Sequence, residues 1–155
     1  MANSNQKFYP AKSEGLSDRL PPQNIEAEQS VLGGLMLEKN AIIKVVDILC
    51  SGDFYRQTHN LIYEAMLNLF EKNEPIDILS LTDKLKEKKA IEDVGGSSYL
   101  TELVNSIPTA AHLVHYAKIV HRKKVLRDLI EAADHIAGLG YQETEDLETL
   151  LDDAE

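Results

Sequence analysis

The side chains best suited to chemistry in this 155-residue chain lie together, between positions 112 and 127. Five cations stand there beside three histidines: Lys118, Arg122, Lys123, Lys124 and Arg127, with His112, His115 and His121. Such a run is typical of a solvated helix face, and it also suits contacts with phosphates or with an acidic partner. The sequence leaves both interpretations open.

Other chemical patterns are incomplete. His112 and His115 stand three residues apart, but zinc needs at least a third ligand, so no metal site is predicted. The chain has no GxxxxGK(S/T) phosphate-binding loop. We therefore expect no catalytic residue, no cofactor and no ATP hydrolysis in this chain alone. Cys50 lacks the local signature of a nucleophile and is predicted to be a small buried residue.

Charge is unevenly distributed. The chain has 26 Asp and Glu against 16 Lys and Arg, and seven of the acids with no base lie between positions 141 and 155. A protein built to coat phosphates would be basic overall, so any nucleic-acid contact must be local. The single cysteine gives no sign of an oxidising compartment, and no signal peptide or membrane span is apparent. We expect a cytoplasmic protein without membrane contact.

Helical periodicity runs through the chain, and no strand pattern interrupts it. Residues 1–19 are polar and unpatterned, which predicts a disordered leader. Apolar residues at helical spacing then predict helices over 25–36, 41–50, 58–72, 78–89 and 97–107. The expected helix caps are Asn24, Asn40 and Asp77. Gly33 and Gly34 lie inside the first helix, where they serve close packing or else break the helix.

The next segment, 109–137, contains no Pro or Gly and predicts one helix of about 43 Å, which Gly138 and Gly140 are expected to end. The acidic segment 143–155 predicts a second arm that turns back on the first. The expected fold is therefore all-α. A helical-bundle head at 20–107 is followed by a long antiparallel helical hairpin at 108–155, whose second arm is truncated.

The apolar stripe of this long helix is wider than one packed face requires. We expect six of its residues to form a surface available to a partner or to the head: Leu113, Tyr116, Val120, Leu126, Leu129 and Ile130. The alternative is that they form only intramolecular core. Spacing and composition alone thus indicate an all-helical interaction domain.

Several blocks of sequence carry a family resemblance. They are RLPPQNIEAEQSVLGGLML at 19–37, GDFYRQTHNLIYEAM at 52–66, PIDILSLTDKL at 75–85, VGGSSYLTEL at 94–103, and IPTAAHLVHYAKIV followed by LRDLI between 107 and 130. Together they resemble the N-terminal domain of the DnaB-type hexameric replicative DNA helicase of bacteria. The PPxxIEAEQSVLGG opening is the most distinctive block.

The resemblance implies a collar domain that pairs with a second copy through its hairpin, with three such dimers closing a hexamer. It also implies contacts with primase and with helicase loader or initiator proteins in the primosome. The full-length family member unwinds duplex DNA at the replication fork with ATP and Mg, and threads single-stranded DNA through its ring. Its C-terminal RecA-like ATPase domain is absent from these 155 residues. Two alternatives stay open, a nucleic-acid-binding module that uses the basic run 118–127 and an adaptor that binds a helicase.

Overall fold

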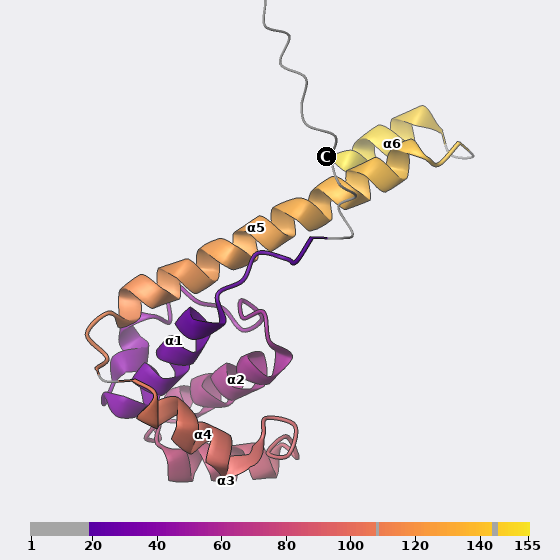
Figure 1. Cartoon of the computed structure of the whole chain (residues 1–155). Helices are drawn as coiled ribbons and strands as arrows, with labels where there is room; N and C mark the ends of the chain where they lie inside the picture. The colour runs from indigo at the N-terminus through magenta and orange to yellow at the C-terminus, as the bar shows by residue number, and fades with distance from the viewer. Residues whose placement is uncertain (1–18, 108, 144–145) are drawn as a thin grey trace, which may run out of the picture. The chain divides into compact units, whose positions relative to one another are not determined.

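The computed structural model describes residues 19–107, 109–143 and 146–155, and all of its regular elements are helical (Figure 1). They are α1 (Ile25–Leu37), the 3₁₀ helix η2 (Ala41–Lys44), α2 (Gln57–Glu71), α3 (Ile78–Glu87), α4 (Gly96–Asn105), α5 (Leu113–Gly140) and α6 (Leu147–Ala154). The prediction of an all-α fold is confirmed. The predicted leader, apart from Arg19, lies outside the described residues. Within the described ranges, no helix is long and apolar enough to cross a membrane.

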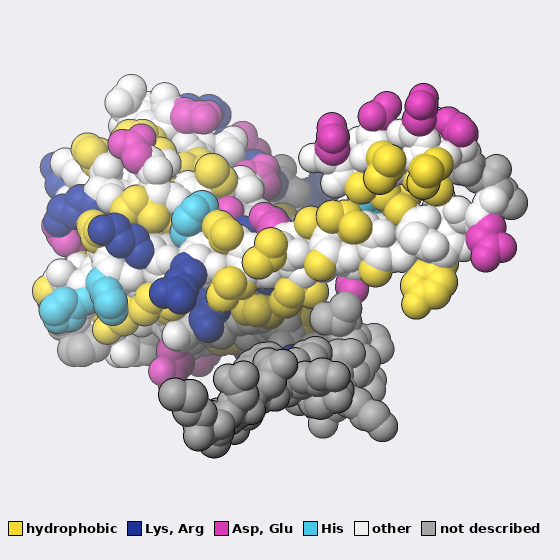
Figure 2. All heavy atoms as spheres, turned by 90° about the horizontal axis from the view of Figure 1, so that it is seen from above, with side chains coloured by type: hydrophobic (Ala, Val, Ile, Leu, Met, Phe, Trp, Pro, Cys, Tyr) yellow, Lys and Arg dark blue, Asp and Glu magenta, His cyan; other side chains and the backbone are white. Residues whose placement is uncertain are grey.

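The chain divides into two compact units, and α5 contributes to both. Residues Pro22–Leu129 form one unit, and Ile130–Glu155 belong to the other. The first unit contains the predicted head together with α5 as far as Leu129. In the second unit, the two views agree that α6 turns back beside the last turns of α5, and Leu139 there is 6% exposed (Figures 1 and 2).

The core of the first unit lies where α1 packs on α4 and α2 packs on α3. Its largest fully buried side chains are Tyr63, Leu32, Leu35, Ile42, Leu49, Ile62, Met66, Leu69, Leu81, Leu85, Leu100 and Leu103. Two of the predicted caps are confirmed. Asn24 Oδ1 accepts a hydrogen bond from the Ala27 amide at 2.9 Å, and Asp77 Oδ1 accepts one from the Ser80 amide at 2.8 Å. Each satisfies an amide that the first turn of its helix leaves without a partner.

The two glycines of α1 allow close helix packing, as one of the two interpretations predicted. A Cβ added at Gly33 would overlap Ile107 Cδ1 and the carbonyl oxygen of Leu103. At Gly34 an added Cβ would stand 3.1 Å from Leu113 Cδ1. Helix α1 continues through both glycines, so the alternative of a broken helix is wrong.

The predicted helix over 41–50 is wrong. Only the four residues of η2 are helical there, and the backbone then continues in short turns. Asn40 does not cap it, because this residue adopts a left-handed conformation with φ 62° and its side chain makes no cap hydrogen bond. The segment is rich in β-branched Ile and Val, which disfavour the α-helix. Its burial is nevertheless real, since Ile42, Val45 and Leu49 all join the core.

Tyr63 of α2 fastens this irregular segment to the bundle. The buried Tyr63 hydroxyl donates a hydrogen bond to the Leu49 carbonyl at 3.0 Å. Burial raises the pKa of Tyr63 far above its ordinary value, and the nearby Cys50 and Asp53 add to the shift. The phenol therefore stays protonated and keeps donating.

The long helix begins and ends later than predicted. Thr109 Oγ1 accepts a hydrogen bond from the Ala111 amide, and this local turn competes with helix before Leu113. At the other end, α5 continues through Gly138, so the prediction of an end at residue 137 is wrong, but Gly140 is its last residue, as one of the two predicted stops. Leu139 lies in this additional turn and is buried, which stabilises the longer helix. The second arm, expected over 143–155, is helical over Leu147–Ala154.

Candidate functional site

The first turns of α5 are fixed to the head by one apolar face. Leu113, Ala117 and Val120 recur at helical spacing, are at most 2% exposed, and belong to the hydrophobic core. Tyr116 is half-buried at the edge of the same core. Leu113 and Val120, two of the six residues predicted to form an interaction surface, thus contact the head. Their side chains have almost no exposed area for a partner.

A second apolar stripe follows on α5 and is exposed. Its members are Val125, Leu129, Ala132 and Ile136, separated by four, three and four residues, which is the spacing of a coiled-coil seam. Val125 is 50% exposed, Leu129 65% and Ile136 48%. Hydrophobic side chains line this helix in the space-filling view (Figure 2). We name this set the α5 stripe.

The other three predicted interface residues lie on or beside the α5 stripe. Leu129 is the most exposed of the three large side chains in the stripe, Ile130 is 37% exposed, and Leu126 is half-buried. Three of the six predicted residues, Leu126, Leu129 and Ile130, therefore retain apolar surface that the described residues do not cover.

The basic run is not one free patch. Arg127 donates to the carbonyl oxygens of Pro22 and Asp53, both at 2.8 Å, and its guanidinium carbon lies 5.5 Å from the centre of the Tyr55 ring. Lys124 forms an ion pair with Asp128 on the next turn. Arg127 therefore ties α5 to two segments of the head instead of offering its charge to a phosphate.

The remaining cations of the run are Lys118, Arg122 and Lys123. Lys118 and Arg122 are exposed and Lys123 is half-buried. None of the three takes part in an ion pair among the described residues. They form the part of the run that has charge available for a partner.

The histidines make local contacts. His121 Nδ1 lies 3.0 Å from Asp53 Oδ2, a carboxylate that is 6% exposed and also accepts from the Cys50 amide. His112 and His115 pack against the Tyr116 ring. In the part of the chain that the structure describes, no three His, Cys, Asp or Glu side chains are grouped as a metal site would require.

The prediction that Cys50 is buried is wrong, because its side chain is exposed. The residue opens the tight turn at 50–53, where its amide donates to Asp53 Oδ2 at 3.1 Å.

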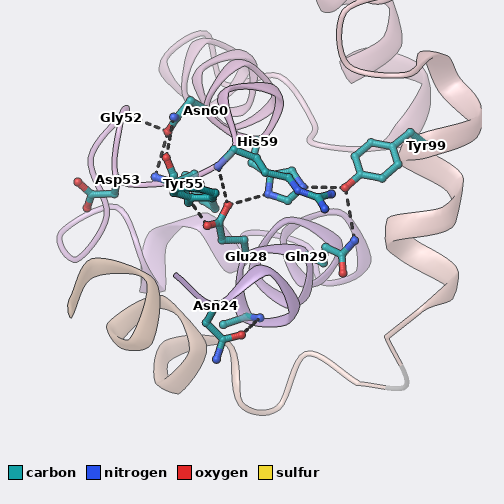
Figure 3. Close-up of polar contacts among 12 residues, drawn as sticks. Asn24, Glu28, Gln29, Gly52, Asp53, Tyr55, His59, Asn60 and Tyr99 are labelled. Atoms are coloured by element: carbon teal, nitrogen blue, oxygen red, sulfur yellow. Dashed lines mark hydrogen bonds and ion pairs between the residues drawn. The ribbon is translucent and has the colours of Figure 1, made fainter. Parts of the chain in front are cut away.

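A buried polar network that the sequence did not reveal joins α1, α2 and α4 (Figure 3). Glu28 Oε1 lies 2.8 Å from His59 Nδ1, and His59 Nε2 lies 2.7 Å from the Tyr99 hydroxyl. Glu28 also accepts from the amides of Tyr55, at 2.9 Å, and Arg56, at 3.3 Å. Glu28 is 2% exposed and His59 is 0% exposed. The network holds a carboxylate in the core by giving it several donors.

Nothing in the local sequence pairs Glu28 with His59, because the two residues lie 31 positions apart. The burial of Glu28 could have been inferred from its position in the helix. It precedes Val31 and Leu32 by three and four residues, which places it on the buried face of α1. A carboxylate on that face needs partners, and a histidine can provide one. The contacts of Glu28, His59 and Tyr99 hold α1, α2 and α4 together, which is a structural role.

Comparison with known proteins agrees with this architecture. A family model described as the DnaB-like helicase N terminal domain matches residues 20–122. The replicative DNA helicase DnaC of Bacillus subtilis is 49% identical over 140 residues, which cover 90% of this chain and 31% of that protein. The replicative DNA helicase DnaB of Geobacillus stearothermophilus is 45% identical over 143 residues, 92% of this chain and 32% of that protein.

A solved structure shows the same fold. The N-terminal domain of DnaB helicase from Mycobacterium tuberculosis superposes with a TM-score of 0.84 at 41% identity, covering 87% of this chain and 95% of that one. The chain spans about a third of the length of the two curated relatives. The resemblance inferred from the sequence blocks is confirmed, and the chain belongs to the family of DnaB-like helicase N-terminal domains.

Proposed function

We propose that this chain is the assembly domain of a replicative DNA helicase, and that the α5 stripe joins it to a second copy of itself. The observation that carries the proposal is the stripe: exposed Val125, Leu129 and Ile136 recur at coiled-coil spacing on a helix of 28 residues. Apolar side chains in such a row bury well only against another elongated surface. The names of the relatives supply the context of DNA replication.

In the assembled protein, pairs of this domain form a hexameric collar as a trimer of dimers. The collar contacts primase and the helicase loader or initiator, and single-stranded DNA passes through the complete ring at the replication fork. Unwinding is powered by ATP and Mg bound to an ATPase domain outside these 155 residues. The family resemblance supports this wider role.

Nucleic-acid binding by the basic run is the weaker candidate, and the geometry favours it less than assembly. Arg127 is held by the head and Lys124 is paired with Asp128, which reduces the five cations to three. Fewer available cations mean fewer phosphates neutralised and a weaker, less salt-dependent contact.

The test is sedimentation equilibrium of the wild-type chain and of Leu129→Asp. Burying one leucine contributes about 1.5–3 kcal/mol, and a symmetric dimer buries two, so the charged variant should weaken association by at least about 100-fold. Leu79→Asp is the matched control, because Leu79 is 73% exposed but lies on α3, away from the stripe. Self-association that survives Leu129→Asp unchanged would refute the proposal.

A further inference from the structure

A cleft opens on the head where α1 and α2 end, and it lies wholly within the unit Pro22–Leu129. Its volume is about 680 Å³, which is in the range of clefts that hold ligands. The end of α1 and η2 form one wall, and the segment that joins α2 to α3 forms the other. The apolar side chains along it include Leu35, Leu37, Ile42, Ile43, Phe70 and Ile76.

The apolar surface of the cleft is partly open to solvent. Leu35 and Ile42 are core residues, each at most 2% exposed. Leu37 and Ile43 on the same wall are 46% and 58% exposed, and Phe70 on the other wall is half-buried. Large apolar side chains exposed around a concave surface are typical of an interaction site. The cleft can therefore accept an apolar side chain of a partner.

The last turn of α1 borders the cleft with hydrogen-bond acceptors. The Gly34 carbonyl accepts from the Glu38 amide at 3.1 Å, but no donor among the described residues bonds the carbonyl oxygens of Leu35, Met36 or Leu37. The C-terminal end of a helix carries partial negative charge, and neither α1 nor α2 has a basic residue in its last turn to offset it. These acceptors favour a ligand that is cationic and donates hydrogen bonds.

The charged side chains of the cleft have the same preference. Three acids, Glu38, Glu74 and Asp77, line it together with the base Lys39. Glu38 is neutralised by an ion pair with Lys44 at 2.5 Å. Glu74 is exposed and takes part in no ion pair among the residues that the structure describes. Glu74 and Asp77 thus remain against Lys39, which leaves the cleft negative.

We propose that this cleft binds a basic segment of another protein, in which arginine or lysine flanks a large apolar side chain. The apolar side chain packs between Ile43 and Phe70, and the cation pairs with Glu74 and donates to the carbonyls at the end of α1. An acidic segment would be repelled by the carboxylates and would leave those carbonyls without donors. This interaction is separate from the proposed self-association, because none of the cleft residues belongs to the α5 stripe.

Defined peptides test the chemistry of the cleft. The probes are the capped peptides GRLFRG, GELFEG and GRGGRG, added to the isotopically labelled chain with Leu129→Asp, so that association through the stripe does not interfere. GRLFRG should shift the amide signals of the cleft residues with a Kd of about 1 mM or tighter, at least about tenfold tighter than the other two peptides. Raising NaCl from about 0.05 to about 0.5 M should weaken its binding, because the charges are then screened.

Two matched pairs of variants locate the binding. Glu74→Lys should weaken GRLFRG binding by about three- to tenfold, whereas Glu102→Lys makes the same change on α4, outside the cleft, and should leave it unchanged. Ile43→Ser should weaken binding by about tenfold, whereas Leu79→Ser alters a side chain that is 73% exposed but does not line the cleft, and should have no effect. Circular dichroism checks that each variant keeps its helix content.

Other outcomes would overturn the proposal. Equal affinity for GRLFRG and GELFEG, signal shifts confined to residues outside the cleft, or no binding by about 5 mM would each do so. If the cleft signals of the Leu129→Asp chain move on dilution without any peptide, a second copy is the occupant and the proposal is also wrong. Sedimentation tests the stripe and peptide binding tests the cleft, so either proposal can fail while the other stands.

Discussion

The glycine at position 33 lets α1 and α4 approach each other, and its replacement by alanine gives a quantitative test of the packing. The added Cβ would overlap the Leu103 carbonyl and stand 3.0 Å from its carbon, so the backbone of α4 must move. Overpacking of this kind costs about 1–3 kcal/mol. Alanine is the better helix former by about 1 kcal/mol, which offsets part of this cost. We expect Gly33→Ala to lower the free energy of unfolding by up to about 2 kcal/mol.

Two other glycines serve as controls for the same substitution. Gly34→Ala brings a Cβ to 3.1 Å from the flexible Leu113 side chain and into ordinary contact with Ala110, and it should change stability little. Gly138 lies in α5 with nothing within 4 Å of an added Cβ, so Gly138→Ala should cause no loss and gain up to about 1 kcal/mol in local helix stability.

Urea unfolding followed by far-UV circular dichroism measures all three variants. The expected order of stability is Gly33→Ala lowest, with Gly34→Ala and Gly138→Ala at or above the wild type. If Gly33→Ala proves as stable as Gly138→Ala, α1 and α4 do not make the close contact on which the reasoning depends.

Three further predictions address the polar contacts of the head. Glu28→Ala leaves the Tyr55 and Arg56 amides without their acceptor and should lower the free energy of unfolding in urea by about 3 kcal/mol. Glu28→Gln keeps one carbonyl oxygen and should lose less, so equal losses would contradict the network. Arg127→Ala removes two backbone contacts and should reduce hydrogen-exchange protection around residues 53–56, unlike Arg122→Ala; unchanged protection would refute the anchor. Burial raises the pKa of Tyr63, whereas an unfolded tyrosine titrates near pH 10. The free energy of unfolding should therefore fall above about pH 10 more steeply in the wild type than in Tyr63→Phe. Parallel pH profiles of the two proteins would contradict the burial of this phenol.

Much of the head follows from local patterns. The caps at Asn24 and Asp77 and the apolar spacing of α1 and α2 were predictable, because a helix start and a buried face each depend on residues a few positions apart. Segment 41–50 was mispredicted because its prediction also depended on local spacing alone. Its apolar spacing is helical, but Asn40 and the β-branched residues favour turns that still bury the same side chains.

The long helix shows where local reasoning stops. Periodicity identifies Leu113 and Leu129 as apolar positions of α5, yet it does not say that the head covers the first and leaves the second exposed. The role of Arg127 depends on carbonyls 105 and 74 residues away in sequence, at Pro22 and Asp53. The Glu28–His59–Tyr99 network likewise joins three helices. Such contacts exist only once the chain has folded.

The carboxylate of Glu28 has one more consequence. Helix α2 has no side-chain cap of its own at Arg56, and the amides of Tyr55 and Arg56, where it begins, are satisfied by Glu28 from α1. One helix thereby supplies the starting point of another. A fragment that ends before α2 lacks the amides of Tyr55 and Arg56, and a fragment that begins there lacks Glu28. The head is therefore expected to fold and unfold as a single cooperative unit. Evolution or engineering can exchange it whole more easily than it can recombine its parts.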